Sequence, residues 1–194
     1  MKKLILSFGL LALVAGASFS LQSCNKIKDE IAKQIDPFNF TEQDITYDVP
    51  VLTMSGTFVA NDTDNININQ MIKDEAGVDF NIDNVSSIKI KKITLSILNA
   101  DNENNWTNAE AVAAGFQTKT GNANGKQIQI WARNINDVEA ERFADQVIEP
   151  NDVNLKDYFN GSGEEVYYHI SATARRATNK QLNVNAKIEY EVKF

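Results

Sequence analysis

The chain of 194 residues is poor in residue types that define whole classes of site. It has one cysteine, one histidine and three prolines. A single cysteine excludes an internal disulfide and a cysteine-based zinc or iron–sulfur centre. A single histidine excludes a multi-histidine metal centre and leaves any histidine-dependent mechanism to His169 alone. The formal charge of -7 disfavours electrostatic attraction to nucleic acid. Neither a G-x-G-x-x-G motif before a helix nor a P-loop is present, so no nucleotide is an expected partner.

The N-terminus has the organisation of a secretory signal. Lys2 and Lys3 give it a positive start, and residues 4–20 are uncharged and mostly apolar. Leu21, Gln22 and Ser23 then precede Cys24, which is the only cysteine of the chain. A charged start, an apolar run and small residues before a cleavage point predict export.

The run from Leu21 to Cys24 resembles the lipobox of bacterial lipoproteins. The resemblance implies that residues 1–23 are cleaved as a signal peptide, that the Cys24 thiol receives a diacylglycerol, and that the new amine is acylated, for example with palmitate. Residues 28–30 (Lys-Asp-Glu) resemble the charged tract of surface lipoproteins in Bacteroidota. The chain is therefore expected in the Gram-negative cell envelope as an outer-membrane lipoprotein, on either the outer or the periplasmic face. The alternative is an ordinary secretory signal followed by a free cysteine.

Residues 24–40 are expected to form a lipidated tether before the folded domain. Ile27, Ile31 and Ile35 are four residues apart, which fits one face of a short helix, and Glu30 can pair with Lys33. Pro37 ends such a helix because it disfavours helical geometry in the residue before it. A flexible charged spacer is the alternative.

Residues 41–194 predict one antiparallel β-sandwich domain, Ig-like or jelly-roll-like, with about 7–9 strands and one or two short helices in the connections. The strongest signal is in residues 182–194, where seven apolar positions alternate with six polar ones. Residues 166–175 repeat the pattern, and the short polar link 176–180 predicts a hairpin between the two strands. A transmembrane β-barrel is the alternative, because a terminal phenylalanine on an alternating strand is typical of such barrels.

The remaining elements follow from shorter patterns. Further strands are expected at 45–51 (an edge strand, because of Pro50), 52–60, 88–97 with a bulge at 91–92, and 128–132. Helices are expected at 67–76, which Gly77 ends, and at 136–147, with one further turn at 154–158. Asparagine-rich loops are expected at 61–65, 99–105 and 121–125.

Catalytic signals are weak. His169 lies on the polar phase of its strand, and no G-x-S-x-G elbow accompanies it. Three pairs of glutamates are close in sequence: Glu139 with Glu141, Glu164 with Glu165, and Glu189 with Glu191. A glycosidase needs two carboxylates across a cleft, which sequence neighbours on one strand do not provide. A small glycan-directed envelope hydrolase that uses acidic residues or His169 is thus the alternative to a non-catalytic protein.

A calcium site is the one cofactor that the sequence offers. Asp101, Glu103 and Asn105 place oxygen-bearing side chains at alternate positions, and residues 61–65 do likewise. The EF-hand pattern is absent, because Trp106 and Val112 stand where it needs glycine and glutamate. The alternative is a polar turn whose side chains bind their own backbone.

Exposed aromatic residues are the most suggestive feature for binding. Trp131 shares a strand phase with polar Gln129 and Arg133 and not with Ile128 and Ile130. In the same way Tyr167 shares a phase with His169, and Trp106 follows an asparagine-rich loop. We therefore expect Trp106, Trp131, Tyr167 and His169 to form a ligand or interface surface for an envelope protein or an extracellular glycan. The alternative is that a loop or the 136–147 helix covers these rings. The sequence predicts a non-catalytic, lipid-anchored binding domain or structural accessory subunit.

Overall fold

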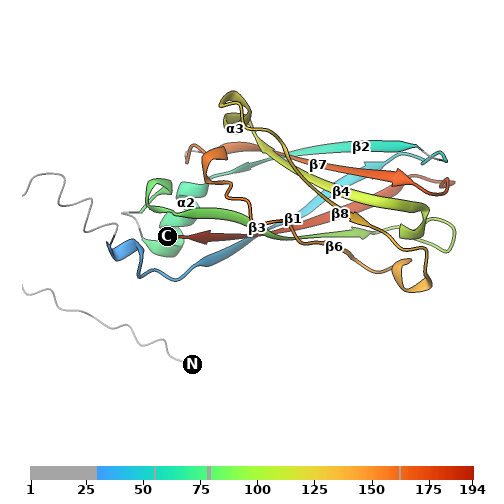
Figure 1. Ribbon diagram of the computed structural model, residues 1–194, viewed down its shortest axis with the longest axis horizontal. Helices are drawn as coiled ribbons and strands as arrows, with labels where there is room; N and C mark the ends of the chain where they lie inside the picture. The colour runs from blue at the N-terminus through green and yellow to red at the C-terminus, as the bar shows by residue number, and fades with distance from the viewer. Residues whose placement is uncertain (1–29, 55, 78–79, 162) are drawn as a thin grey trace, which may run out of the picture.

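The computed structural model describes residues 30–54, 56–77, 80–161 and 163–194, which form two packed antiparallel sheets (Figure 1). One sheet has the strand order β1-β8-β3-β6 and the other has the order β2-β7-β4-β5. The strands are β1 (Phe38–Val49), β2 (Thr57–Ile66), β3 (Ser87–Ile97), β4 (Ala109–Thr118), β5 (Gln129–Asn134), β6 (Gln146–Ile148), β7 (Glu164–Ala174) and β8 (Leu182–Lys193). The all-β sandwich prediction is confirmed. The predicted signal peptide and Cys24 lie outside the described residues.

Short helices fill the connections. They are α2 (Ile68–Ala76), α3 (Lys119–Ala123) and the 3-10 turns η1 (Ile82–Asn84), η2 (Trp106–Asn108), η3 (Glu139–Glu141) and η4 (Lys156–Tyr158). The predicted helix at 67–76 is confirmed by α2. Its N-terminus is capped by the Asn67 side chain, which accepts a hydrogen bond from the Gln70 N–H, and it ends at Gly77, which has a φ of 110°. The single turn predicted at 154–158 is confirmed by η4.

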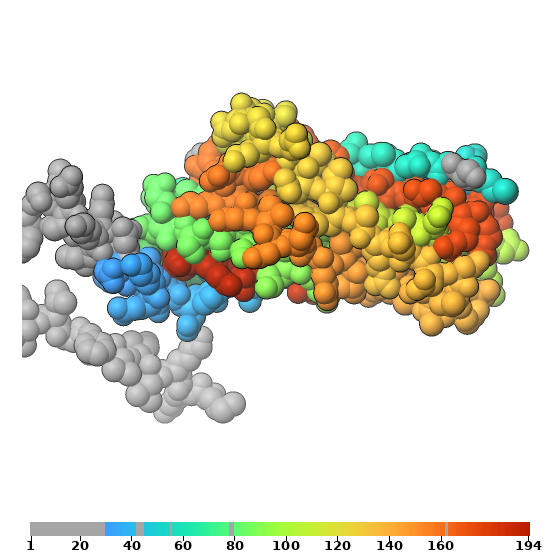
Figure 2. All heavy atoms as spheres, in the orientation of Figure 1, coloured from blue at the N-terminus to red at the C-terminus, as the bar shows by residue number. Residues whose placement is uncertain are grey.

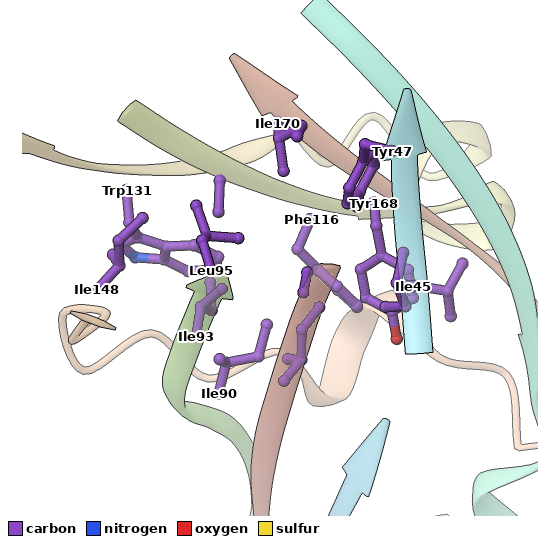
Figure 3. Packing of buried hydrophobic residues seen from close by; sticks show 14 of the residues in the cluster. Ile45, Tyr47, Ile90, Ile93, Leu95, Phe116, Trp131, Ile148, Tyr168 and Ile170 are labelled. Atoms are coloured by element: carbon purple, nitrogen blue, oxygen red, sulfur yellow. The ribbon is translucent and has the colours of Figure 1, made fainter. Parts of the chain in front are cut away.

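The core lies between the inner faces of the two sheets. Burial alternates residue by residue along β7, with every second side chain buried, as the pattern predicts. Five aromatic rings gather in the core, because Phe116 contacts the rings of Tyr158, Phe159, Tyr168 and Tyr190. Figure 3 shows Phe116 and Tyr168 among the aliphatic side chains of the core. The hydroxyls of Tyr168 and Tyr190 share a hydrogen bond of 2.8 Å. This bond satisfies two buried polar groups and joins the two sheets.

The predicted hairpin of residues 166–175 and 182–194 is wrong. β7 pairs with β2 and β4, whereas β8 pairs with β1 and β3 in the opposite sheet. The link 175–181 therefore crosses from one sheet to the other. Alternation shows only that both strands have one face in the core, and two strands of facing sheets meet that condition as well as two paired strands do.

The predicted helix at 136–147 is also wrong. The segment has one 3-10 turn, η3, and then the short strand β6, in which Ile148 pairs with Ile93 of β3. Val138 and Phe143, which the helix would have turned toward the sheet, are 51% and 56% exposed. Burial of Gln146 and Ile148, two residues apart, follows a strand period and overrides the local helix signal.

The other local predictions have mixed outcomes. The register shift between Ile90 and Lys92 confirms the β3 bulge, and β1 is an edge strand as predicted. β1 begins at Phe38, however, so the last residues of the predicted tether belong to the sheet. Residues 99–105 form a loop as expected, but 61–65 continue β2 and 121–125 begin inside α3.

The sandwich has two ends, which differ in what they carry. At one end, here the proximal end, β1 starts where β8 finishes, with Phe38 beside Val192 (Figure 1). Residues 30–32 are helical there, and Lys33 pairs with Glu30 at 2.9 Å as predicted. At the other end, Val49 pairs with Leu182 where β1 finishes and β8 begins. The segments 50–54, 98–108, 135–145 and 175–181 connect the strands at that end, and we call them the distal loops.

Candidate functional site

The structure divides the predicted site residues among three places. Trp131 lies between the sheets, and Tyr167 and His169 lie on the outer face of β7. The remaining residues, Asp101, Glu103, Asn105 and Trp106, belong to the distal loops.

The aromatic platform predicted from Trp131 and Trp106 is wrong, because both indoles are buried, with exposed fractions of 6% and 5%. Trp131 pairs across the sheet with the buried residue Ala114, so its side chain faces the core, and Figure 3 shows it beside Ile148. Ile130, which was expected inside, pairs with Gly115 and is 62% exposed.

Polar neighbours of Trp131 are accommodated at the rim of the sandwich. The guanidinium of Arg133 donates to Glu141 at 3.2 Å and to the Val147 carbonyl at 3.2 Å. Gln129 donates to the Tyr158 hydroxyl at 2.6 Å. β5 is an edge strand, so its inner face reaches the margin of the core, where long polar side chains find partners. The polarity of Gln129 and Arg133 therefore predicted the wrong orientation for Trp131, which lies on the same face of β5.

The predicted calcium ligands instead hold the loop that contains them. Asp101 Oδ1 accepts hydrogen bonds from the N–H groups of Glu103 and Asn104, at 2.9 Å and 2.8 Å. Its Oδ2 is 2.6 Å from Lys180 Nζ. The Lys180 ammonium, followed by the Asn104 side chain, holds the pKa of Asp101 well below its usual range.

The side chain of Asn105 is 2% exposed and makes four hydrogen bonds that hold the same loop together. Its Oδ1 accepts hydrogen bonds from the N–H and hydroxyl of Thr107, at 3.0 Å and 2.8 Å. Its Nδ2 donates to the carbonyls of Asp101 and Asn102, at 3.0 Å and 3.2 Å. Within the described ranges, no group of three His, Cys, Asp or Glu residues is arranged to hold a metal. The contacts of Asp101 and Asn105 are those expected of a polar turn, and the calcium site stays a prediction.

Side chains also brace the distal loops against one another. Asn104 accepts a hydrogen bond from the Asn179 N–H at 2.9 Å, and Asn108 donates to the Ala177 carbonyl at 2.9 Å. Arg175 donates to the carbonyl of Ile135 at 2.6 Å and to that of Thr107 at 3.2 Å. Arg176 forms an ion pair with Asp137. The Thr178 hydroxyl also accepts a hydrogen bond from the Leu52 N–H at 2.9 Å, so side chains tie all four loops together.

Exposed apolar side chains concentrate at this end of the molecule. Eight large apolar residues are strongly exposed in the described part of the chain, and five of them lie in or beside the distal loops. These are Val51, Met54, Leu98, Val138 and Phe143, with exposed fractions of 51–74%. The predicted 136–147 helix would have turned Val138 and Phe143 toward the sheet, and none of the five was expected to be exposed, although apolar residues inside turn-rich segments were a visible signal.

The basic residues divide between the two ends. All four arginines lie in or next to the distal loops: Arg133, Arg142, Arg175 and Arg176. Of the eleven lysines in the described ranges, Lys180 alone lies in those loops. Protein interfaces are enriched in arginine, methionine and aromatic residues and depleted in lysine. The distal loops follow this pattern in their arginines and in their single lysine, but not in their acidic residues, such as Asp101 and Glu139.

Tyr167 and His169 lie on a different surface, the outer face of the β2-β7-β4-β5 sheet. The Tyr167 hydroxyl donates to Glu165, which raises the pKa of the phenol. His169 Nδ1 is hydrogen-bonded to Asn61 Oδ1, and burial lowers the pKa of the imidazole. The partner that orients His169 is an amide, whereas a catalytic base needs a nucleophile within reach.

The paired glutamates are likewise engaged. Glu164 is 3% exposed and accepts a hydrogen bond from the Thr120 N–H at 2.6 Å. Glu141 pairs with Arg133, and Glu139 pairs with Arg142 at 3.1 Å. Glu189 and Glu191 are within ion-pair distance of lysines on β3 and β8. These contacts give the carboxylates structural partners and do not place two of them across a cleft.

Comparison of the sequence with known protein families and with curated proteins finds no match in either. In the described part of the chain, none of the helices combines the length and the apolar character needed to cross a membrane.

Proposed function

We propose that this protein is a non-catalytic, lipid-anchored domain of the cell envelope that binds a protein partner through its distal loops. The observation that carries the proposal is the concentration of exposed apolar side chains on loops that buried asparagines hold in place. Exposed apolar side chains that gather at one end of a domain are typical of an interaction site, and a pre-ordered loop loses little entropy on binding.

The placement of the two ends supports the same function. The chain enters the sandwich at the proximal end, where residues 30–32 precede β1. An anchor at Cys24 would attach the domain to the membrane from this end, so the distal loops would face away from the lipid surface (Figure 1). A binding surface opposite the anchor is open to a partner on either face of the outer membrane.

Replacing Cys24 with serine tests the anchor. We expect Cys24→Ser to move the protein from the membrane fraction to the soluble fraction and to abolish metabolic labelling with palmitate, because several acyl chains give stable attachment and none can form on serine. Ser23→Ala, next to the attachment point, serves as control and should keep the label. A Cys24→Ser variant that stays in the membrane and retains the label would contradict the anchor.

Site-specific photo-crosslinking in intact cells tests the binding surface. A photoreactive amino acid at Phe143 or Leu98 should give one discrete cross-linked species, because both side chains are exposed on the distal loops. The same group at Lys187, exposed on the outer face of β8, should give none. Adducts of equal yield at all three positions, or none at Phe143 and Leu98, would remove the distal loops as the binding surface.

A further inference from the structure

β2 is an edge strand of the β2-β7-β4-β5 sheet and lies at the upper right of Figure 1 and of the space-filling view in Figure 2. Its ten residues pair with β7 alone, from Thr57 to Ile66, with no shift of register. In an antiparallel pair, every second residue directs its N–H and C=O away from its partner. The other edges are less regular, because β1 has a register irregularity between Glu42 and Ile45, while β5 and β6 have six and three residues.

Two aspartates cover part of this edge. The Thr63 N–H donates to Asp62 Oδ1 at 2.8 Å, and the Asn65 N–H donates to Asp64 Oδ1 at 2.6 Å. The Ala174 N–H donates to the Gly56 carbonyl, so in this register the even-numbered positions of β2 bond to β7, and the N–H groups of Thr63 and Asn65 point to the free edge. Each carboxylate thus occupies a donor that would otherwise attract another strand.

The two carboxylates have no basic partner among the described residues, since none of the ion pairs there includes Asp62 or Asp64. Burial and then the charge of Asp62 raise the pKa of Tyr47 on β1, so the Asp62 carboxylate lies near that strand of the facing sheet. A second β2 strand paired about Thr63 would place Asp62 opposite Asp64. Like charges directly opposite one another destabilise such a pair.

We propose that the β2 edge binds an extended segment of a partner protein that has lysine or arginine at alternate positions. The carbonyls of the incoming strand accept hydrogen bonds from the Thr63 and Asn65 N–H groups, and the displaced carboxylates of Asp62 and Asp64 pair with its cations. An acidic or uncharged strand displaces the same carboxylates without a compensating ion pair. Main-chain hydrogen bonds to the added strand supply the affinity, and the two aspartates make the site selective for a positively charged strand. This site is separate from the distal loops and does not depend on the anchor.

Two labelled peptides, KTKVKTK and ETEVETE, test the proposal on the full chain in detergent. By fluorescence anisotropy the basic peptide should bind roughly 2- to 30-fold more tightly, which is the range for two exposed ion pairs. The difference should shrink at high salt because the charges are exposed. Hydrogen exchange should slow at residues 57–66 when the basic peptide is bound. Equal affinities, no binding of either peptide, or protection confined to other residues would overturn the proposal.

Amide variants separate charge from hydrogen bonding. Asp62→Asn with Asp64→Asn keeps an oxygen that can accept from the edge N–H groups but removes both charges, so the preference for KTKVKTK should disappear. Asp74→Asn with Asp83→Asn removes two exposed charges elsewhere and should preserve the preference. A preference that survives the first double variant, or is lost in the second, would contradict selection by β2.

Discussion

Replacing Trp131 with alanine is expected to lower the free energy of unfolding by about 3–5 kcal/mol, the usual cost of truncating a buried aromatic side chain. The indole is 6% exposed and is part of the continuous core between the sheets. Alanine would leave a cavity beside Ile148 that the edge strand β5 can fill only in part. Chemical denaturation followed by far-UV circular dichroism measures the loss.

The neighbouring residue provides a matched control. Ile130 is 62% exposed, so Ile130→Ala should change the free energy of unfolding by no more than about 0.5 kcal/mol. If Trp131 were instead a surface residue, as the polarity of its strand first predicts, the two substitutions would have equally small effects. A small loss for Trp131→Ala would therefore overturn the burial of the indole in the core.

The sandwich was predictable because alternation is a direct physical consequence of a strand with one face in the core. Residues 182–194 follow this rule along their whole length, and β8 has the expected burial. Strand pairing was not predictable from the same signal. β7 and β8 are neighbours in sequence, yet the choice between a hairpin and a crossing to the other sheet depends on long-range contacts.

The errors at the candidate site share one physical cause. An edge strand of a sandwich has a rim at which polar side chains on the inner face reach water or a partner. Arg133 and Gln129 use that rim, so polarity assigned Trp131 to the wrong face. Composition was misleading for residues 61–65 as well: their Asn and Asp residues predicted a loop, but the segment pairs with β7, and its exposure at the sheet edge makes polar side chains tolerable. The exposure of residues such as Phe143 could not be predicted from a local pattern, because it depends on where the loop lies in three dimensions.

Replacing Asn105 with alanine is expected to lower the free energy of unfolding by about 2–4 kcal/mol, and to release the loop that contains it. The substitution removes four hydrogen bonds of one side chain that is 2% exposed, and one of these bonds is the cap of η2. Chemical denaturation measures the loss of stability, and hydrogen exchange should accelerate at residues 98–108. The cross-link yield from Leu98 should fall as well, because the loop would no longer be held in its binding geometry.

Two variants separate these contributions. Asn102→Ala alters an exposed residue of the same loop whose carbonyl, and not its side chain, meets Asn105, so its effect should stay within about 0.5 kcal/mol. Asn105→Asp keeps the oxygen that caps η2 but places a buried carboxylate oxygen against the carbonyls of Asp101 and Asn102, so its stability should fall at least as far as that of Asn105→Ala. If Asn105→Ala were as stable as wild type and gave the same cross-link from Leu98, the asparagine network would not be what orders the distal loops. The proposal that these loops are pre-ordered for binding would then lose its physical basis.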